Sequence, residues 1–101
     1  MYLDSYRNKI SKLCKKHKVK HLFAFGSVLT SKFSEASDVD FLVDINSKDP
    51  ITYAENYFEL KFDLEDLLKR KIDLLEERAL NNEYFIENIN NSKKIIYGAW
   101  Y

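Results

Sequence analysis

The sequence is short of several residues that would mark particular classes of protein. Its 101 residues include one cysteine, one proline and two glycines, and 16 basic side chains are matched by 16 acidic ones. The one cysteine, Cys14, cannot form an internal disulfide, and its helical spacing with Ile10 predicts a place in the core. A chain without net charge lacks the basic excess of proteins that bind nucleic acids through phosphates, so we find no strong nucleic-acid signal.

The sequence also lacks long apolar runs. No stretch approaches the roughly 20 apolar residues that span a bilayer, and Asp4 and Arg7 interrupt the start before an apolar signal segment can form. These absences predict a soluble, cytoplasmic protein with no membrane partner. Apolar residues nevertheless make up 46% of the chain, and fourteen of them are Tyr or Phe. They suffice for one packed core, so we expect a single domain over residues 1–101.

The pattern of apolar residues predicts short elements that follow one another closely. We expect a helix over 2–17, strands over 21–25 and 38–44, a helix over 51–69, a strand over 71–75 and a helix over 82–91. Asp49-Pro50 is a typical helix start. The fourth element is expected to bury Tyr57, Leu60, Leu64, Leu67 and Leu68, and the last helix to turn Tyr84, Phe85 and Ile89 inward. The tail from Lys94 fits a short strand or a helix end.

This order of elements predicts an α/β (α+β) fold with a small mixed β-sheet and helices packed on one face. The segment 27–37 is shorter than the dozen or more residues of a usual parallel crossover. We therefore expect the strands 21–25 and 38–44 to be antiparallel and joined by a helical turn. Such a pair places Gly26-Ser27 beside Asp38.

Two aspartates share one side of the strand 38–44. Side chains alternate along a strand, so Asp38 and Asp40 point one way and Val39 and Phe41 the other. Adjacent like charges raise the free energy of the ionised pair. Water on an exposed strand face is enough to offset this repulsion, and taken alone the pair favours that interpretation. A magnesium ion, which prefers carboxylate oxygens and substrate phosphates, is the more specific alternative.

A third aspartate, Asp73, lies in the middle of the apolar strand 71–75. Aspartate is depleted in strands, and if this strand neighbours 38–44 its carboxylate can reach the same site as Asp40. Three such groups form a candidate two-metal site, which stabilises both oxygens of an in-line displacement. Gly26 permits close approach of the backbone to a phosphate, and a helical turn from Ser27 presents N–H groups to an anion. Alone, these two residues would be read as an ordinary strand-ending turn.

Together these motifs resemble the DNA polymerase beta-type nucleotidyltransferase superfamily, whose pattern is Gly-Ser, a spacer, Asp-x-Asp and a later lone Asp. Here the pattern reads Gly26-Ser27, Ser37-Asp38-Val39-Asp40 and Asp73. The length and layout resemble the minimal nucleotidyltransferases, the MNT-domain proteins often paired with HEPN-domain partners. The likeness runs from the first strand to about Tyr97.

The resemblance implies a reaction and roles. Two Mg²⁺ ions would be bound by Asp38, Asp40 and Asp73, with Asp73 also helping to take the proton of the attacking hydroxyl. Gly26 and Ser27 would hold the triphosphate of ATP or another nucleoside triphosphate. AMP would pass to a hydroxyl, in one version on a HEPN-type toxin for which this chain is the antitoxin. The small size favours a large partner, and the oligomeric state stays open.

One departure from the family supports an alternative. Many relatives carry an Arg soon after Gly-Ser, whereas the first cation here is Lys32. A binding subunit that neutralises its partner by contact, with little or no transfer activity, is therefore the second hypothesis. A magnesium-binding receiver-like domain ranks far below, because it needs more parallel strands.

Other polar and aromatic residues have structural interpretations. His17 and His21 lack metal-ligand spacing, so we expect structural histidines. Asp44 shares a strand face with Asp40 but is expected at a solvated strand end. The aromatic residues of the tail are expected to pack or to anchor an interface; they are Tyr97, Trp100 and Tyr101.

Overall fold

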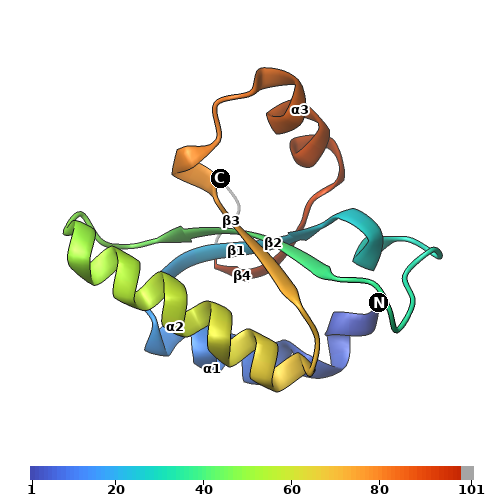
Figure 1. Cartoon of the computed structure of the whole chain (residues 1–101), viewed down its shortest axis with the longest axis horizontal. Helices are drawn as coiled ribbons and strands as arrows, with labels where there is room; N and C mark the ends of the chain where they lie inside the picture. The colour runs from blue at the N-terminus through green and yellow to red at the C-terminus, as the bar shows by residue number, and fades with distance from the viewer. Residues whose placement is uncertain (99–101) are drawn as a thin grey trace.

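The computed structural model describes residues 1–98, which form three α-helices, four strands and three 3-10 turns (Figure 1). Trp100 and Tyr101 of the aromatic tail lie outside the described residues. In chain order the elements are η1 (Tyr2–Tyr6), α1 (Arg7–Lys16), β1 (Val19–Phe25), η2 (Gly26–Leu29), β2 (Val39–Ile45), α2 (Pro50–Leu68), β3 (Ile72–Glu76), η3 (Glu77–Ala79), α3 (Glu83–Ser92) and β4 (Lys94–Gly98).

The strands form one mixed sheet in the order β3-β2-β1-β4. Strand β1 is antiparallel to both β2 and β4, whereas β2 and β3 are parallel. The antiparallel pairing predicted from the short segment 27–37 is confirmed. The parallel pair needs a long crossover, and α2 supplies it. The small mixed sheet agrees with the predicted fold class.

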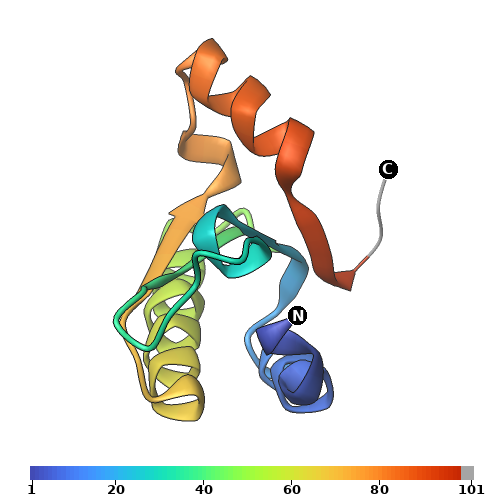
Figure 2. The same ribbon diagram turned by 90° about the vertical axis from the view of Figure 1, so that its right-hand side faces the viewer.

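Helices α1 and α2 lie side by side on one face of the sheet (Figures 1 and 2). The main core fills the space between them and the sheet. It includes Val39, Phe41 and Val43 of β2 together with Leu60 and Leu64 of α2, all fully buried. Burying each such side chain stabilises the fold by roughly 2 kcal/mol. The alternation predicted for β2 therefore faces its apolar side to the helices.

Helix α3 departs from the expectation that helices pack on one face. Its Ile89 packs against Phe23, Phe25 and Leu42, which belong to a second cluster on the opposite face of the sheet (Figure 2). Strands β1 and β2 carry apolar residues on both faces in their middle, so neither face can be left to water. The short helix α3 covers part of the second face, which lies opposite α1 and α2 (Figure 2).

Helix α2 begins as the sequence predicts. The Asp49 side chain accepts a hydrogen bond from the backbone N–H of Thr52 at 2.9 Å, and Pro50 is the first helical residue. The helix ends at Lys69, which has a left-handed backbone with φ of 53°. Its inward residues match the prediction, since three leucines are buried and Tyr57 and Leu67 pack partly buried against the core.

The end of the chain differs more from expectation. Tyr84 and Phe85 are 77% and 40% exposed, so the prediction that they face inward is wrong, whereas Ile89 is buried as predicted. Helix α3 has ten residues, and among them only Ile89 is buried against the sheet. The ambiguous tail forms the edge strand β4, in which Tyr97 is half-buried. Within residues 1–98, no helix combines the length and apolar character needed to cross a bilayer.

Candidate carboxylate site

Parallel pairing of β2 and β3 brings two of the predicted site residues together. Asp40 is the direct register partner of Asp73, and neighbouring strands lie about 4.8 Å apart. Val39 and Ile72, the preceding pair, face the helix core. Both aspartates therefore point to the opposite face of the sheet. Asp40 is half-buried and Asp73 is exposed.

The electrostatics of Asp40 reflect this crowding. Burial raises the pKa of its carboxyl, and the negative charges of Asp73 and then Asp38 raise it further. The ionised form is therefore destabilised relative to a solvated aspartate. A bound cation would reverse that effect, because it favours the charged carboxylate. The site has the chemistry of a hard-cation site, with oxygen ligands only.

Asp38, the third predicted ligand, is held somewhat apart. It lies just before β2, and its Oδ2 atom is 4.0 Å from Nζ of Lys71. Over residues 1–98, no three acidic, histidine or cysteine side chains converge on one point as a ready metal cage. Magnesium usually binds through one or two carboxylates together with substrate phosphates, so the pair Asp40 and Asp73 fits this ion. Asp38 is exposed at the edge of this pair, near enough for its charge to raise the pKa of the Asp40 carboxyl.

Gly26 lies against the carboxylates, as the antiparallel pairing predicts. The last residue of β1, Phe25, pairs with Asp40, and Gly26 follows with a left-handed φ of 76°. A Cβ atom on Gly26 would lie 2.5 Å from Oδ2 of Asp40, closer than such atoms approach. The left-handed backbone favours glycine here, and any other residue would also push the Asp40 carboxylate aside. Ser27 comes next, in the helical turn η2.

Lys71 is a residue of the site that the sequence analysis missed. It precedes Asp73 by two residues, and its backbone carbonyl accepts a hydrogen bond from the Val39 N–H at 3.2 Å. Its spacing from Asp73 puts the two side chains on the same face of the extended chain. That spacing is the signal in the sequence that could have identified Lys71. It places a positive charge at the edge of the acidic group.

The remaining polar candidates have structural partners. His17 Nε2 lies 2.6 Å from the Asp63 carboxylate and His21 Nε2 lies 2.6 Å from that of Glu77, so the expectation of structural histidines is confirmed. Asp44 is held by Arg78 at 2.9 Å, so its expected solvated strand end is wrong. Cys14 is buried as predicted, and burial raises the pKa of its thiol to about 12.

Comparisons with known proteins agree with this geometry. The family model for polymerase beta nucleotidyltransferases matches residues 8–99. A protein of Methanocaldococcus jannaschii named "putative protein adenylyltransferase" is 34% identical over 74 residues, which is 73% of each chain. The chain thus shares sequence over most of its length with a protein that carries this name.

Solved structures agree as well. One described as a "putative minimal nucleotidyltransferase" superposes with a TM-score of 0.75 at 28% identity, covering 92% of this chain and 91% of the other. A toxin–antitoxin structure with AMP-PNP superposes with a TM-score of 0.71 at 25% identity, covering 92% and 73%. The fold, the aspartate spacing and the family match converge, and the chain belongs to the polymerase beta nucleotidyltransferase family.

Proposed function

We propose that this chain transfers AMP from ATP to a hydroxyl group on a protein, with a HEPN-type toxin as the acceptor. The observation that carries the proposal is the pairing of Asp40 with Asp73 on one sheet face, with Gly26 in contact with Asp40. An acidic pair beside a glycine turn can hold a cation and a phosphate next to each other.

Each residue has a distinct role in the proposed reaction. Asp38, Asp40 and Asp73 would hold two magnesium ions, and the backbone and hydroxyl of Gly26-Ser27 would hold the triphosphate. Bound magnesium would supply neutralisation of the phosphate charge. Asp73 would orient the acceptor hydroxyl and help to accept its proton. The hydroxyl oxygen forms a bond to the α-phosphorus, the bond to the β-phosphate oxygen breaks, and pyrophosphate leaves.

The protein acceptor is supported by the relatives. The Methanocaldococcus protein carries the name of a protein adenylyltransferase, and the nucleotide-bound structural neighbour is a toxin–antitoxin complex. With 101 residues this chain has little material for a separate acceptor-binding domain. A partner protein that docks its own hydroxyl at the carboxylates removes that need.

Transfer of label from α-labelled ATP tests the proposal. Purified chain and its HEPN-type partner, incubated with Mg²⁺, should yield labelled partner. Asp40→Asn and Asp73→Asn should each lower the rate by about 100-fold or more, since one charged group in such a site is typically worth that much. Asp44→Asn is the matched control. It lies on the same strand and face as Asp40 but is paired with Arg78, and it should keep the label.

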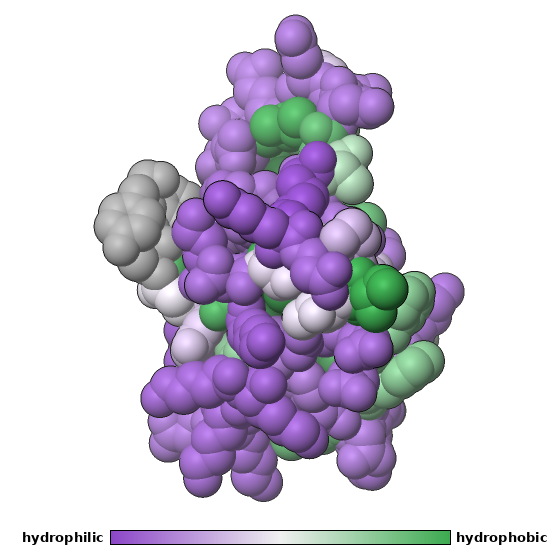
Figure 3. Space-filling model, turned by 90° about the vertical axis from the view of Figure 1, so that its left-hand side faces the viewer, coloured by the Kyte–Doolittle hydropathy of each residue, from purple (hydrophilic) through white to green (hydrophobic). Residues whose placement is uncertain are grey.

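A second function is favoured by the outward face of α2. Ile51, Phe58 and Phe62 are 70%, 53% and 62% exposed and follow one another along this face. A partner protein that bound to these apolar side chains could be neutralised by contact, without transfer of AMP. Figure 3 looks from the side where α2 begins and shows apolar patches at the surface among hydrophilic side chains. Complex formation that survives Asp40→Asn, with no label on the partner from the wild type, would favour an antitoxin that acts by contact alone.

A further inference from the structure

Arg70 lies at the junction of α2 and β3 and holds a loop that is distant in sequence. Its Nη1 donates hydrogen bonds to the backbone carbonyls of Ser34 at 3.1 Å and Ser37 at 2.8 Å. These two residues form a small turn, closed by the Ser37 N–H donating to the Ser34 carbonyl at 3.1 Å. One guanidinium therefore fixes both ends of the turn.

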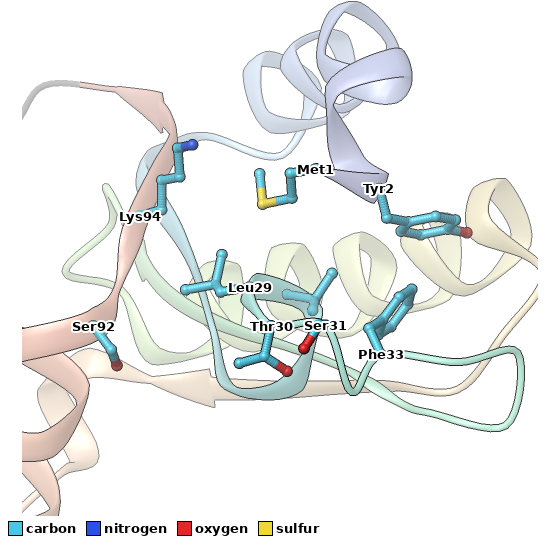
Figure 4. Close-up of a pocket in the computed structure, with 9 residues that line it drawn as sticks. Met1, Tyr2, Leu29, Thr30, Ser31, Phe33, Ser92 and Lys94 are labelled. Atoms are coloured by element: carbon cyan, nitrogen blue, oxygen red, sulfur yellow. The ribbon is translucent and has the colours of Figure 1, made fainter.

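Two aromatic rings complete the setting of Arg70. The guanidinium carbon lies 4.7 Å from the ring centroid of Tyr2 and 4.6 Å from that of Phe33, within range of cation–π attraction. The rings themselves are 5.0 Å apart and tilted by 44°. Figure 4 shows Tyr2 and Phe33 facing each other where the N-terminal segment meets the loop, beside a cavity of about 560 Å³. Arg70 thus joins three segments of the chain.

The loop held in this way connects the two parts of the carboxylate site. Residues 30–38 run from the end of η2 to the start of β2 without a helix or strand. One end carries the Gly26-Ser27 turn and the other carries Asp38. In the part of the chain that the structure describes, both hydrogen bonds that tie residues 31–37 to a distant segment come from Arg70. Freed from them, an exposed loop of this length samples many conformations.

Arg70 also lies three residues before Asp73, on the segment that leads into β3. The same side chain that holds the carbonyl before Asp38 is therefore anchored next to the strand that carries Asp73. We propose that Arg70 is a positioning residue, which sets Asp38 and the Gly26-Ser27 turn in register with Asp73. The inference rests on the proposed function, because it deepens the description of the same site.

The chemistry at this position calls for arginine. The planar guanidinium donates hydrogen bonds to two carbonyls in its plane and stacks on two aromatic rings with its faces. A lysine ammonium is a compact point charge and cannot do both. Arg70→Lys should therefore recover only part of the Mn²⁺ affinity that Arg70→Met loses. If the positive charge alone mattered, Arg70→Lys would recover all of that affinity.

Arg78 offers a matched control at the far end of β2. It donates to the backbone carbonyls of Ile45 at 2.7 Å and Ser47 at 3.1 Å and lies 4.3 Å from the ring centroid of Tyr53. It therefore shares the carbonyl and ring contacts of Arg70, adds an ion pair with Asp44 at 2.9 Å, and holds a different loop. Arg78→Met should lower stability and free Asp44, but it should leave Asp38, Asp40 and Asp73 in place.

The experiment compares wild type, Arg70→Met, Arg70→Lys and Arg78→Met, each checked for a folded thermal transition above the assay temperature. Binding of Mn²⁺ alone is measured by electron paramagnetic resonance, and amide hydrogen exchange is followed over residues 30–38. Arg70→Met should weaken Mn²⁺ binding by about 10-fold, as loss of a group that orients a metal ligand typically does, and should speed exchange in the loop. Its KM for ATP in label transfer should rise in parallel.

The outcomes separate this inference from the proposed function. Mn²⁺ affinity in Arg70→Met within twofold of wild type, or an equal loss in Arg78→Met, would overturn the positioning role. An active wild type would leave the proposed function standing in either case. A wild type that binds Mn²⁺ but transfers no label would remove the proposed reaction, while the Mn²⁺ comparison would still decide the role of Arg70. Arg70→Lys keeps the test decisive if the methionine variant does not fold.

Discussion

Asp40 is placed where its ionised carboxylate suits the proposed chemistry but lowers the stability of the fold. Burial, Asp73 and Asp38 raise the pKa of its carboxyl in the folded chain above the unfolded value. The folded state therefore binds more protons than the unfolded state between those two pKa values, and stability falls as the pH rises through that range. At neutral pH the ionised carboxylate lowers the free energy of unfolding, and a bound cation would offset this loss.

Removing that charge should stabilise the apo protein. At pH 7 without divalent cations, we expect Asp40→Asn to raise the melting temperature, and the difference from wild type to shrink as the pH is lowered toward the pKa of Asp40. Melting curves from pH 4 to 8 measure it. Asp44→Asn, which removes the charge that pairs with Arg78, should lower the melting temperature instead. A lower melting temperature for Asp40→Asn at pH 7 would contradict this account of the pKa.

Gly26 is constrained by the same carboxylate. Gly26→Ala should destabilise the fold by at least about 1–2 kcal/mol, because a left-handed backbone disfavours a Cβ and the new atom would meet Asp40 Oδ2. Urea unfolding measures the loss. A double-mutant cycle with Asp40→Ala separates the two causes of this loss. Without the Asp40 carboxylate, Gly26→Ala should cost less, because only the strain of the left-handed backbone remains. Strict additivity of the two substitutions would exclude the contact as a cause.

At the scale of elements, α2 decides where the third aspartate lies. It is the crossover that makes β3 run parallel to β2, and it ends at Lys69 with φ of 53°. The reversal that follows leads through Arg70 to Lys71 and β3. A helix end with this geometry usually carries glycine. The chain has lysine there, in an exposed pair with Asp66 that contributes little.

Lys69→Gly should therefore stabilise the protein by about 0.5–1 kcal/mol, because glycine adopts the left-handed conformation without steric cost. Chemical denaturation provides the measurement. Lys69→Ala is the control, since it removes the same charge but keeps the Cβ, and it should leave stability nearly unchanged. Equal gains from both substitutions would point to the charge and not to the backbone.

For the whole molecule, the distribution of apolar surface matters most. The main core lies under α1 and α2, the second cluster lies under α3, and the outward face of α2 still carries Ile51, Phe58 and Phe62. An amphipathic helix that packs one face on its own sheet has no internal use for apolar residues on the other. If the proposed function is right, this outward face is where we expect its HEPN-type partner to dock.

Phe62→Asp should weaken binding to that partner by about 10-fold or more while leaving the melting temperature of the isolated chain unchanged. Isothermal titration with the purified partner measures the affinity. Tyr84→Asp is the control, because Tyr84 is 77% exposed on α3, outside the proposed surface. The assignment would be wrong if both substitutions weakened binding equally.

Local patterns were sufficient to predict a large part of this protein. The period of two predicted that Asp38 and Asp40 share the side away from Val39 and Phe41. The short segment before β2 favoured an antiparallel pair, and Asp49 begins α2 as expected. Each of these follows from neighbours within a few residues, where sterics and hydrogen bonding leave few choices. The family resemblance rested on the same motifs and was confirmed by the match over residues 8–99.

Contacts between distant segments were decided only by the tertiary structure. The direct pairing of Asp40 with Asp73, the Lys71 contact to Asp38 and the hold of Arg70 on the loop all depend on β3 packing beside β2. So does the place of α3, which covers the second face and leaves Tyr84 in solvent. The pairing of distant strands depends on how much apolar surface the whole fold buries. No single stretch of sequence determines that total.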